Sequence, residues 1–475
     1  MNTTQPRLKP SSATSSLAVD TPTPAPDTDF LDRVALVSFQ KLVLASGELR
    51  FPCHPAMLDE QMALIRVVME ALGQRPPAAV LAHWRDLLAE KAIAAASPQA
   101  TLRVTFHPAE PLLGLVGGFQ VGISAWVDDH PESLDSPPPH SSLLAQTLAQ
   151  GTLRMAALPS LIDQHLRQMR RLLEALGQSI TAAEVTGWRG AIAPILHQLF
   201  QRSPNAYLVV RYRVLDPTHG LPSGIALDIA GEITSVEAEY QAWTQTRTGP
   251  LFGSHADAKV LDVAAQLGDP AQAPILDIGA GTGRNSLALA QWGFVVDALE
   301  LAPALVEQLT QAKEAANLSL NVIEGNILDP RLVLPHQQYK LIFLSEVIAS
   351  HFRSVEEVRR LFERLSDLLQ SGGILLFNAF LAVEGYRPTP AVRELAQAFW
   401  SCVFTDAEIR GAMTNLPLQL LLDESVAAYE AAHLPPEAWP PTEWFLGWAT
   451  GRNLFPTVEQ PPIELRWLAW RKWGG

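Results

Sequence analysis

With 475 residues, 48% of them hydrophobic, the chain is long enough for two or three globular domains. Its formal net charge of −14 argues against nucleic acids and anionic membranes as partners, because both are bound through clustered Lys and Arg. Two cysteines exclude a disulfide framework, and with no apolar leader at the start they favour a cytoplasmic location.

The first half of the chain repeats itself. GELRFPCHPAMLD (47–59) returns as GTLRMAALPSLID (151–163), and SPQATLRVTF (97–106) returns as SPNAYLVVRY (203–212). Matches this dense predict an internal duplication. We therefore expect a disordered tail rich in Ser, Thr and Pro at residues 1–28, a first copy at 29–135 and a second copy at 136–235.

Each copy has the sequence signals of an α+β unit. Apolar residues recur at helical spacing after Pro55 and Pro159, and Gly73 and Gly177 favour helix ends. A second helix, an alternating strand and a second short strand follow in each copy. Two such copies would form one pseudo-symmetric α+β domain. Nothing in it connects with chemistry, so binding of a protein partner, self-association and a lid over a neighbouring site all stay open.

From residue 236 onward, strands alternate with helices. The apolar segments LDIGA (276–280), VVDALE (295–300), SLNVIEGN (319–326), YKLIFLSEV (339–347) and GILLFNAFL (373–381) are predicted strands. VEEVRRLFERLSDLLQSGG is predicted as an amphipathic helix that stops at its glycines. LQLLLDES and IELRWLAWRK supply a sixth and a seventh strand. The pattern predicts a Rossmann-like α/β domain at 236–475, with a doubly wound, mostly parallel sheet of seven strands.

The first of these strands runs into a glycine-rich loop, with Gly279, Gly281 and Gly283 at alternate positions. In a doubly wound sheet this loop lies where ligands bind. A dinucleotide fingerprint would need a third glycine where Arg284 stands, and a side chain there would crowd a pyrophosphate. Asp277 instead places a carboxylate at the strand end, which suits a ligand that carries an ammonium group. A nicotinamide cofactor is therefore the weaker interpretation.

The stretch from Gly283 to Pro303, GRNSLALAQWGFVVDALELAP, completes a recognisable motif. Together with the glycines it resembles motif I of the class I S-adenosylmethionine-dependent methyltransferases. It is similar in particular to their tellurite-resistance-type branch, in which an Arg-Asn-Ser run enters the first helix. The resemblance covers residues 236–475. It implies that S-adenosylmethionine is the cofactor and that these residues bind it: Asp277, Gly279, Ala280, Gly281, Gly283, Asn285, Glu300, Leu301, Asn326, Ile327 and Ser345.

The resemblance also implies a role for several of these side chains. The loop glycines would line the methionine and ribose, and Asp277 would reach the amino-acid end. Glu300 would accept hydrogen bonds from the ribose hydroxyls, since one carboxylate can take two donors. Asn326 stands where the family usually has Asp, and its amide would bind adenine. Ile327 would pack on the adenine face.

Residues for the chemistry are less marked, because methyl transfer needs mainly alignment and exclusion of water. A general base is needed when the acceptor must lose a proton. SEVIASHF (345–352) supplies Glu346 and His351 as candidates. The segment EYQAWTQTRTGPLFGSH (239–255) is either a lid over the cofactor or ordinary packing. The aromatic run WPPTEWFLGW (439–448) is either an acceptor wall or a core cluster, and the core cluster is favoured.

The acceptor class is narrowed by motifs that the sequence lacks. LSEV stands where amino-group nucleic-acid and glutamine methyltransferases have an Asn/Asp-Pro-Pro-aromatic signature. No Pro-Cys nucleophile of the cytosine-C5 type occurs, since Cys402 lies in WSCVF, outside that setting. No His/Glu cluster has metal-ligand spacing. We therefore predict an enzyme that methylates a small molecule. The alternatives are a protein methyltransferase that docks through the duplicated half, and a non-catalytic protein that senses the cofactor or acts as a scaffold.

Overall fold

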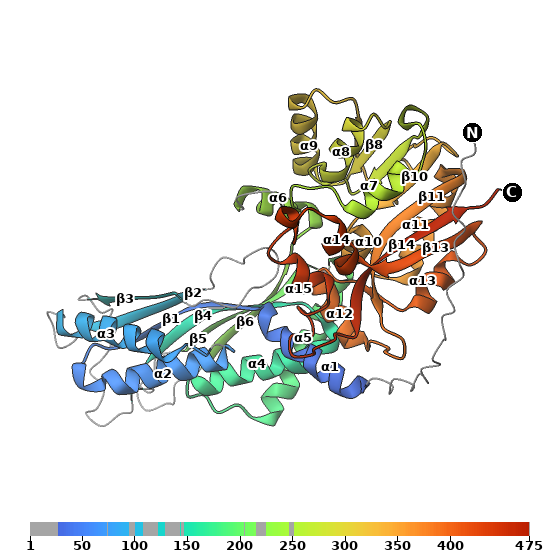
Figure 1. Ribbon diagram of the computed structural model, residues 1–475. Helices are drawn as coiled ribbons and strands as arrows, with labels where there is room; N and C mark the ends of the chain where they lie inside the picture. The colour runs from blue at the N-terminus through green and yellow to red at the C-terminus, as the bar shows by residue number, and fades with distance from the viewer. Residues whose placement is uncertain are drawn as a thin grey trace, which may run out of the picture.

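The computed structural model describes residues 27–73, 75–94, 100–107, 122–128, 143, 147–203, 205–214, 225–246 and 251–474. Two β-sheets follow one another along the described chain, and Figure 1 shows them as two lobes that meet near its centre. The first sheet has six strands in the order β3-β2-β1-β4-β5-β6. The second has eight strands, seven of them on one path, β13-β14-β11-β10-β7-β8-β9.

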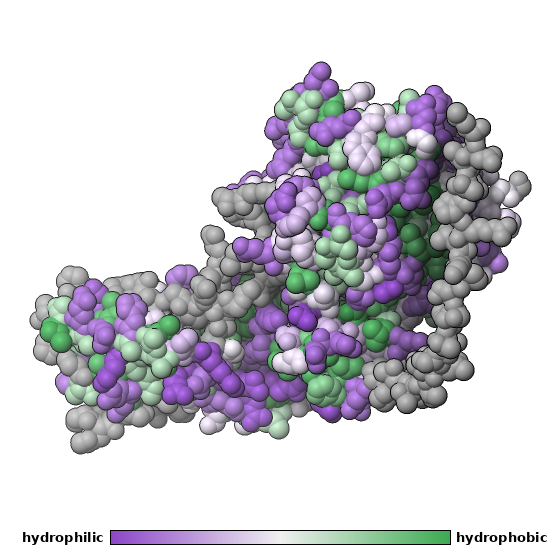
Figure 2. Space-filling model, in the orientation of Figure 1, coloured by the Kyte–Doolittle hydropathy of each residue, from purple (hydrophilic) through white to green (hydrophobic). Residues whose placement is uncertain are grey.

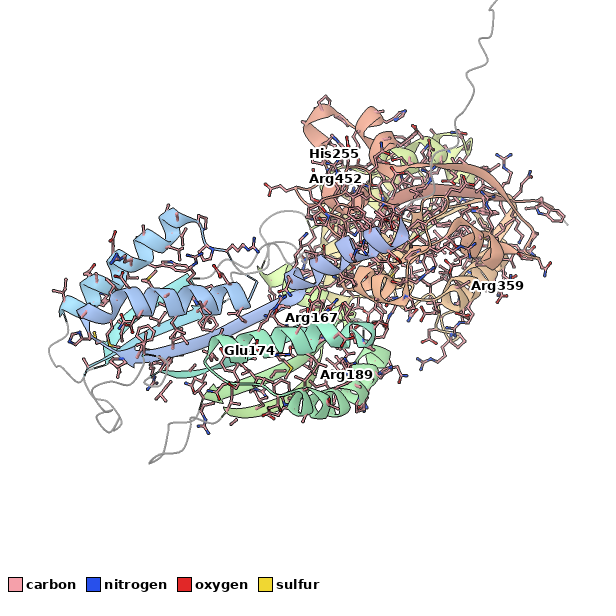
Figure 3. All side chains as sticks on the ribbon, turned by 90° about the horizontal axis from the view of Figure 1, so that it is seen from below. Arg167, Glu174, Arg189, His255, Arg359 and Arg452 are labelled. Atoms are coloured by element: carbon pink, nitrogen blue, oxygen red, sulfur yellow. The ribbon has the colours of Figure 1, made fainter. Side chains whose placement is uncertain are left out.

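All neighbours in the six-stranded sheet pair antiparallel. Its strands are β1 (Val43–Pro52), β2 (Thr101–His107), β3 (Gly122–Asp128), β4 (Leu148–Ala156), β5 (Ala206–Val214) and β6 (Ile225–Ile233). Its helices are α2 (Leu58–Ala71), α3 (Ala78–Ala94), α4 (Ile162–Ala175) and α5 (Ala182–Arg202), with short 3-10 turns η2 (Pro55–Met57) and η5 (Pro159–Leu161). Figure 3 shows α4, which carries Arg167 and Glu174, and α5, which carries Arg189, lying against this sheet.

Each half of this sheet repeats one order of elements: a strand, a 3-10 turn, two helices and two strands. The halves meet where β1 pairs with β4, and Gly47 lies opposite Gly151 in that register. A Cβ on Gly47 would lie 2.6 Å from the Phe106 ring and 2.9 Å from the Tyr212 hydroxyl, so these rings require a residue without a side chain. This repetition is what a duplication would produce, and the duplication itself stays a prediction.

Several elements of the first half were not expected from the sequence. GELRFP and GTLRMA, which revealed the repeat, are parts of β1 and β4. A helix, α1 (Thr28–Val37), begins at the last residue of the expected tail, and the side chain of Asp27 accepts from the backbone N–H of Phe30. A 3-10 turn, η1 (Ser38–Leu42), connects α1 to β1. Residues 1–26 and most of the link between the copies lie outside the described residues.

The second half is a mixed α/β arrangement with mostly parallel strands. Its strands are β7 (Ile275–Ile278), β8 (Val296–Glu300), β9 (Asn321–Glu324), β10 (Tyr339–Leu344), β11 (Leu369–Ala382), β12 (Val403–Phe404), β13 (Leu418–Ser425) and β14 (Ile463–Lys472). All seven expected strands are present, and the two-residue β12 adds an eighth beside β11. β14 runs antiparallel between β11 and β13.

Helices cover both faces of this sheet. Successive side chains of a strand point to opposite faces, so strands that are apolar throughout place apolar side chains on both faces, and both must be covered. In β10, Leu341 and Phe343 pack into one apolar cluster, whereas Ile342 and Leu344 pack into another on the opposite face. The helices of this half are α6 (Val236–Thr246), α7 (Ala258–Ala265), α8 (Arg284–Gln291), α9 (Pro303–Ala315), α10 (Val347–His351), α11 (Val355–Leu368), α12 (Pro390–Ala398), α13 (Asp406–Met413), α14 (Val426–His433) and α15 (Phe445–Ala449).

One predicted helix was too long. The prediction carried it to the glycines at residues 372 and 373, but α11 ends at Leu368. Leu369 is extended and fully buried, and it pairs with Tyr339 of β10. Burial of this leucine in the sheet therefore decides where the helix ends, and the glycines lie inside β11.

The two halves share one continuous apolar core, since α1 and η5 both pack on α12. Polar contacts cross the same junction: the Tyr386 hydroxyl donates to Asp32 at 2.9 Å, and Lys41 Nζ donates to the carbonyl of Asn453 at 3.1 Å. Figure 2 shows that purple and green residues alternate over the exposed face of both lobes. None of the described helices combines the length and apolar composition that a membrane span requires.

Candidate functional site

The glycine loop turns the chain sharply between β7 and α8. Gly279, Gly281 and Gly283 all have positive φ angles, of 74°, 57° and 91°. Side chains rarely adopt this conformation, so the turn needs glycine at these positions. A Cβ on Gly279 would also lie 2.4 Å from a methyl carbon of Val347. The loop therefore brings bare backbone to the edge of the sheet where β7, β8 and β10 end.

Glu300, the last residue of β8, holds this loop in place. Its Oε2 accepts from the backbone N–H of Gly281 at 2.8 Å, and its Oε1 accepts from the N–H groups of Leu301 and Ala302, each at 2.8 Å. Burial raises the pKa of this carboxyl, against the lowering effect of the three N–H donors. A carboxylate has about four acceptor sites, so about one is left for a ligand.

Asp277 lies beneath the same loop, at the end of β7. It is 2% exposed, and Ser286 Oγ donates to its Oδ2 at 2.6 Å. Burial raises the pKa of Asp277 to about 7, against the lowering effect of the Ser286 hydrogen bond, and the charges of Glu300 and Asp257 raise it further. Near neutral pH the carboxyl group of Asp277 is therefore only partly ionised. A cation placed beside it would favour the ionised form.

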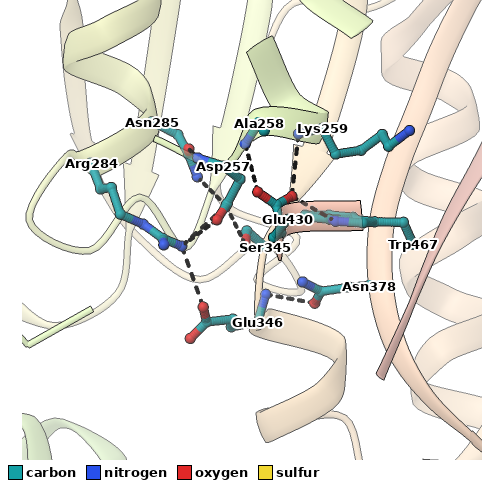
Figure 4. Close-up of polar contacts among 10 residues, drawn as sticks. All are labelled: Asp257, Ala258, Lys259, Arg284, Asn285, Ser345, Glu346, Asn378, Glu430 and Trp467. Atoms are coloured by element: carbon teal, nitrogen blue, oxygen red, sulfur yellow. Dashed lines mark hydrogen bonds and ion pairs between the residues drawn. The ribbon is translucent and has the colours of Figure 1, made fainter. Parts of the chain in front are cut away.

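A buried polar network supports the loop from the side of α8 (Figure 4). Arg284 Nη2 lies 2.9 Å from Asp257 Oδ1 and 3.3 Å from Glu346 Oε1. Asn285 Nδ2 and Ser345 Oγ also donate to Asp257, at 2.9 Å and 2.7 Å. Arg284 thus places one positive charge between two carboxylates, in the position where a dinucleotide fingerprint would have glycine.

The carboxylate of Glu430, in α14, anchors the start of α7 (Figure 4). It accepts from the backbone N–H groups of Ala258 at 2.8 Å and Lys259 at 3.2 Å, and from Trp467 Nε1 at 3.0 Å. The N-terminal N–H groups of a helix have no partner inside the helix, so a buried carboxylate satisfies them well. Neither Asp257 nor Glu430 was singled out from the sequence, because each is paired with residues distant in the chain.

The loop and the network border a cavity of about 310 Å³. Twelve of the thirteen residues predicted for the site line it: Asp277, Gly279, Ala280, Gly281, Asn285, Glu300, Leu301, Asn326, Ile327, Ser345, Glu346 and His351. Gly283 does not. It is the N-cap of α8, and a Cβ there would lie 2.3 Å from Leu309 Cδ1. Gly283, the third glycine of the loop, is therefore required by the packing of α9 against the loop.

Another part of the cavity wall, called the aromatic end below, is lined by ring side chains. His351 Nε2 shares a hydrogen bond of 3.0 Å with the Tyr240 hydroxyl, and the Trp400 ring lies 5.4 Å from the His351 ring. Phe252 also lines the cavity, 6.1 Å from Tyr240 between ring centres. Burial lowers the pKa of His351 to about 4, so its ring is uncharged at neutral pH.

The two aromatic segments singled out from the sequence differ in place, since one lines the cavity and the other packs in the core. Tyr240 and Phe252 of the segment 239–255 line the cavity, and Trp243 packs 5.1 Å from the Trp400 ring. Arg247 of that segment lies outside the described residues. In the run 439–448, Trp448 packs on Phe380 at 5.1 Å and lies in the core rather than on the cavity.

The sequence did not point to some of the residues that line the aromatic end. Asn205 precedes β5, and Arg353, Gln397 and Trp400 come from the segments around α10 and α12. None belongs to a local motif. Arg353, Gln397 and Trp400 meet within the second half, and packing of the two halves brings Asn205 to the same cavity. Among the described residues, no cluster of His, Cys, Asp and Glu has the arrangement of a metal site.

Comparisons with known proteins find similarity to methyltransferases in the second half of the chain. Residues 275–373 match a protein family described as a methyltransferase domain. A candidate methyltransferase of Geobacillus sp. (strain WCH70) is 26% identical over 187 residues. The match covers 39% of this chain and spans 65% of the length of that relative.

Solved structures resemble the chain more weakly. A geranyl diphosphate C-methyltransferase from Streptomyces coelicolor A3(2) is 14% identical with a TM-score of 0.37, over 45% of this chain and 75% of that one. A magnesium protoporphyrin IX methyltransferase from Synechocystis PCC 6803 is 15% identical with a TM-score of 0.30, over 46% and 79%. Scores this low indicate nothing about what this chain binds.

Proposed function

We propose that this chain, whose residues 275–373 match a methyltransferase-domain family, uses S-adenosylmethionine to methylate a small molecule held in the cavity. The observation that carries the proposal is Glu300: a buried carboxylate, fixed by three backbone N–H groups, that lines the cavity beside the glycine loop. A ribose hydroxyl needs a rigid acceptor, and the one acceptor site that Glu300 has left supplies it beside the loop.

The other cavity residues fit the same cofactor. S-adenosylmethionine supplies a methyl group on a positively charged sulfur, which makes that methyl electrophilic. Glu300 would accept from the ribose, and Asp277 would hold the ammonium of the amino-acid end. Asn326 Oδ1 already accepts from the Leu328 N–H at 2.8 Å, so its Nδ2 would be the donor to adenine. Ile327, which is buried, would pack on the base.

The His351 ring at the aromatic end suits an acceptor held there, because it adds no positive charge beside a sulfonium. His351 is neutral at pH 7, since burial lowers its pKa to about 4, and it is a weak base there. Burial raises the pKa of Glu346 to about 7, opposed by the charge of Arg284. A base works best when its pKa is near the working pH, so Glu346 is the better-matched group for an acceptor that loses a proton. His351 would orient Tyr240.

The test uses methyl-tritiated S-adenosylmethionine and a cell extract divided into a small-molecule fraction and a protein fraction. We expect label in extractable small molecules with the wild type. Glu300→Ala should lose most of it, whereas Glu314→Ala, which removes an exposed carboxylate of α9, should not. Label confined to polypeptides would contradict a small-molecule acceptor, and no label in either fraction would contradict the enzyme.

A further inference from the structure

A guanidinium lies at the aromatic end of the cavity. Arg353 follows α10 and lines the cavity together with Gln397. Its Nε donates to Gln397 Oε1 at 3.0 Å, and its Nη2 donates to the carbonyl of Phe200, in α5, also at 3.0 Å. The guanidinium carbon lies 4.3 Å from the centre of the Phe200 ring. These contacts fix the guanidinium at the junction of the two halves of the chain.

The third nitrogen of this guanidinium is available to a ligand. No described residue accepts a hydrogen bond from Arg353 Nη1, since the contacts of the guanidinium are those of Nε and Nη2. The residue is half-buried, and Nη1 is not one of the fully enclosed polar atoms of the described chain, so it keeps accessible surface. Arg353 borders the cavity, so the two N–H bonds of Nη1 can meet an acceptor there.

The charge of Arg353 is not balanced by a close carboxylate. It forms no ion pair within the described part of the chain, whereas Arg284 on the opposite side of α10 has two. Glu357 also lines the cavity, but its Oε2 accepts from the backbone N–H groups of Arg353 and Ser354, at 2.8 Å and 3.3 Å. A half-buried cation that has only neutral acceptors favours an anionic ligand, because burial of an unpaired charge is costly.

The pKa shifts of the two arginines agree with this difference. Burial lowers the pKa of Arg353, and the charges around it do not restore the ordinary value. Burial acts on Arg284 in the same direction, but Asp257 and Glu346 raise its pKa above the ordinary value. Arg284 therefore has its counter-charges in the chain, and Arg353 lacks them.

Trp400 supplies a flat surface beside this cation. Its φ is 55°, a conformation that large side chains rarely adopt, and its backbone N–H donates to the carbonyl of Gln397 at 3.0 Å. Trp448 Nε1 donates to the Trp400 carbonyl, also at 3.0 Å. The Trp400 ring lies 5.4 Å from the His351 ring and 6.0 Å from the Tyr240 ring. Backbone strain on a cavity wall points to a function, and rings at this spacing suit a flat apolar body.

The number of cations limits the charge of the ligand group. Arg284 and Arg353 are the only Lys or Arg side chains among the described residues that line the cavity, and Arg284 lies between two carboxylates. A phosphate group carries about two negative charges at neutral pH, whereas a carboxylate carries one. A carboxylate also accepts N–H groups of a guanidinium in short, charge-assisted hydrogen bonds. One available guanidinium therefore matches a carboxylate.

We propose that Arg353 Nη1 binds the carboxylate group of the acceptor, and that the acceptor is a flat aromatic acid held at the aromatic end of the cavity. The inference rests on the proposed function, because it names the class of acceptor for the same site. Arg353 is then a specificity-determining residue. The N-terminal half takes part in acceptor binding, because its Phe200 orients the guanidinium.

The test compares 4-fluorobenzoate with 4′-fluoroacetophenone, which have nearly the same shape and differ in the charge of the polar group. Binding of each to the full chain is measured by fluorine NMR with S-adenosylhomocysteine at saturation. A hydrogen bond to a charged group corresponds to about a tenfold preference for the benzoate in the wild type. Arg353→Met keeps an apolar stem and removes the guanidinium, so the preference should fall to about one.

A matched control is Arg364→Met, because Arg364 also donates to backbone carbonyls, those of Asp329 and Leu332, but does not line the cavity. It should keep the preference. Equal binding of the two probes by the wild type, or a preference that survives in Arg353→Met, would overturn the assignment of Arg353. If Arg353→Met does not fold, Arg353→Lys decides, because it lacks the planar fork and should lower the preference. An unchanged preference in Arg353→Lys would also overturn the assignment.

Affinity for S-adenosylhomocysteine separates the acceptor from the cofactor, whose amino-acid end carries a carboxylate of its own. Arg353→Met should leave this affinity within about twofold of the wild type. A loss as large as the loss for 4-fluorobenzoate would show that Arg353 binds the cofactor, which would overturn the inference but leave the proposed function standing. Failure of the wild type to bind S-adenosylhomocysteine would overturn the proposed function itself.

Discussion

Three carboxylates, Asp277, Glu300 and Glu346, line one small cavity, and complete or partial burial raises the pKa of each. Their partners differ. Asp277 has one hydroxyl donor, Glu300 has three backbone donors and Glu346 has a guanidinium. These differences suit the three groups to separate tasks. Asp277 can respond to a bound ammonium group, Glu300 is held rigidly, and Glu346 has the guanidinium of Arg284 beside it.

Cofactor affinity should depend on pH through Asp277. Its pKa is about 7, so the fraction that is ionised rises as the pH rises from about 6 to about 8. A ligand ammonium favours the ionised form, so affinity for S-adenosylhomocysteine should increase about tenfold over that range. Asp277→Asn should flatten this dependence. 5′-Methylthioadenosine lacks the amino-acid end, so its calorimetric affinity should hardly change with pH, and an equal dependence for both ligands would contradict this role.

Arg284 should be critical for stability, because it is buried between two carboxylates. Arg284→Met leaves Asp257 and Glu346 without their counter-charge, and breaking a buried pair in this way costs about 3–5 kcal/mol. Adding Glu346→Gln removes one of the two carboxylates that have lost their counter-charge. The double variant should therefore be more stable than Arg284→Met alone. Urea unfolding measures both, and a loss below about 1 kcal/mol in Arg284→Met would show that the network is not stabilising.

At the scale of elements, the local motifs and the strands of the second sheet were predictable, whereas the two central strands of the first sheet, β1 and β4, were not. The glycine loop and Glu300 follow one another within one strand–loop–helix–strand unit, so their spacing reveals them. β1 was missed because Gly47 interrupts its apolar alternation, and that glycine is explained only by the rings of Phe106 and Tyr212 from other strands. Asn205 and Trp400 were missed for the same reason, since packing of distant segments brings them to the cavity.

The start of α8 depends on Gly283. Gly283→Ala combines a positive φ of 91° with a Cβ 2.3 Å from Leu309 Cδ1, so we expect a loss of about 1–2 kcal/mol or more. Gly187→Ala is the control, because Gly187 lies within α5 with nothing near its Cβ position. That change should stabilise the chain by about 0.5–1 kcal/mol. The free energy of unfolding of the two variants should therefore change in opposite directions.

At the scale of the whole molecule, the two halves should unfold together. α1 and η5 pack on α12, and a continuous apolar core crosses the junction. S-adenosylhomocysteine bound at the glycine loop would contact mainly the second half, yet it should shift a single calorimetric transition of the entire chain to higher temperature. Two separate transitions, with the ligand raising one of them, would contradict a shared core.

The central claim is that the glycine loop and Glu300 hold S-adenosylmethionine. Isothermal titration of the wild type with this cofactor tests it most directly. The account predicts saturation at one site per chain, abolished by Gly281→Arg, because φ is 57° there and Phe252 lies 3.3 Å from the Cβ position. The absence of saturable heat, together with saturable fluorescence on titration with NADH, would contradict the account.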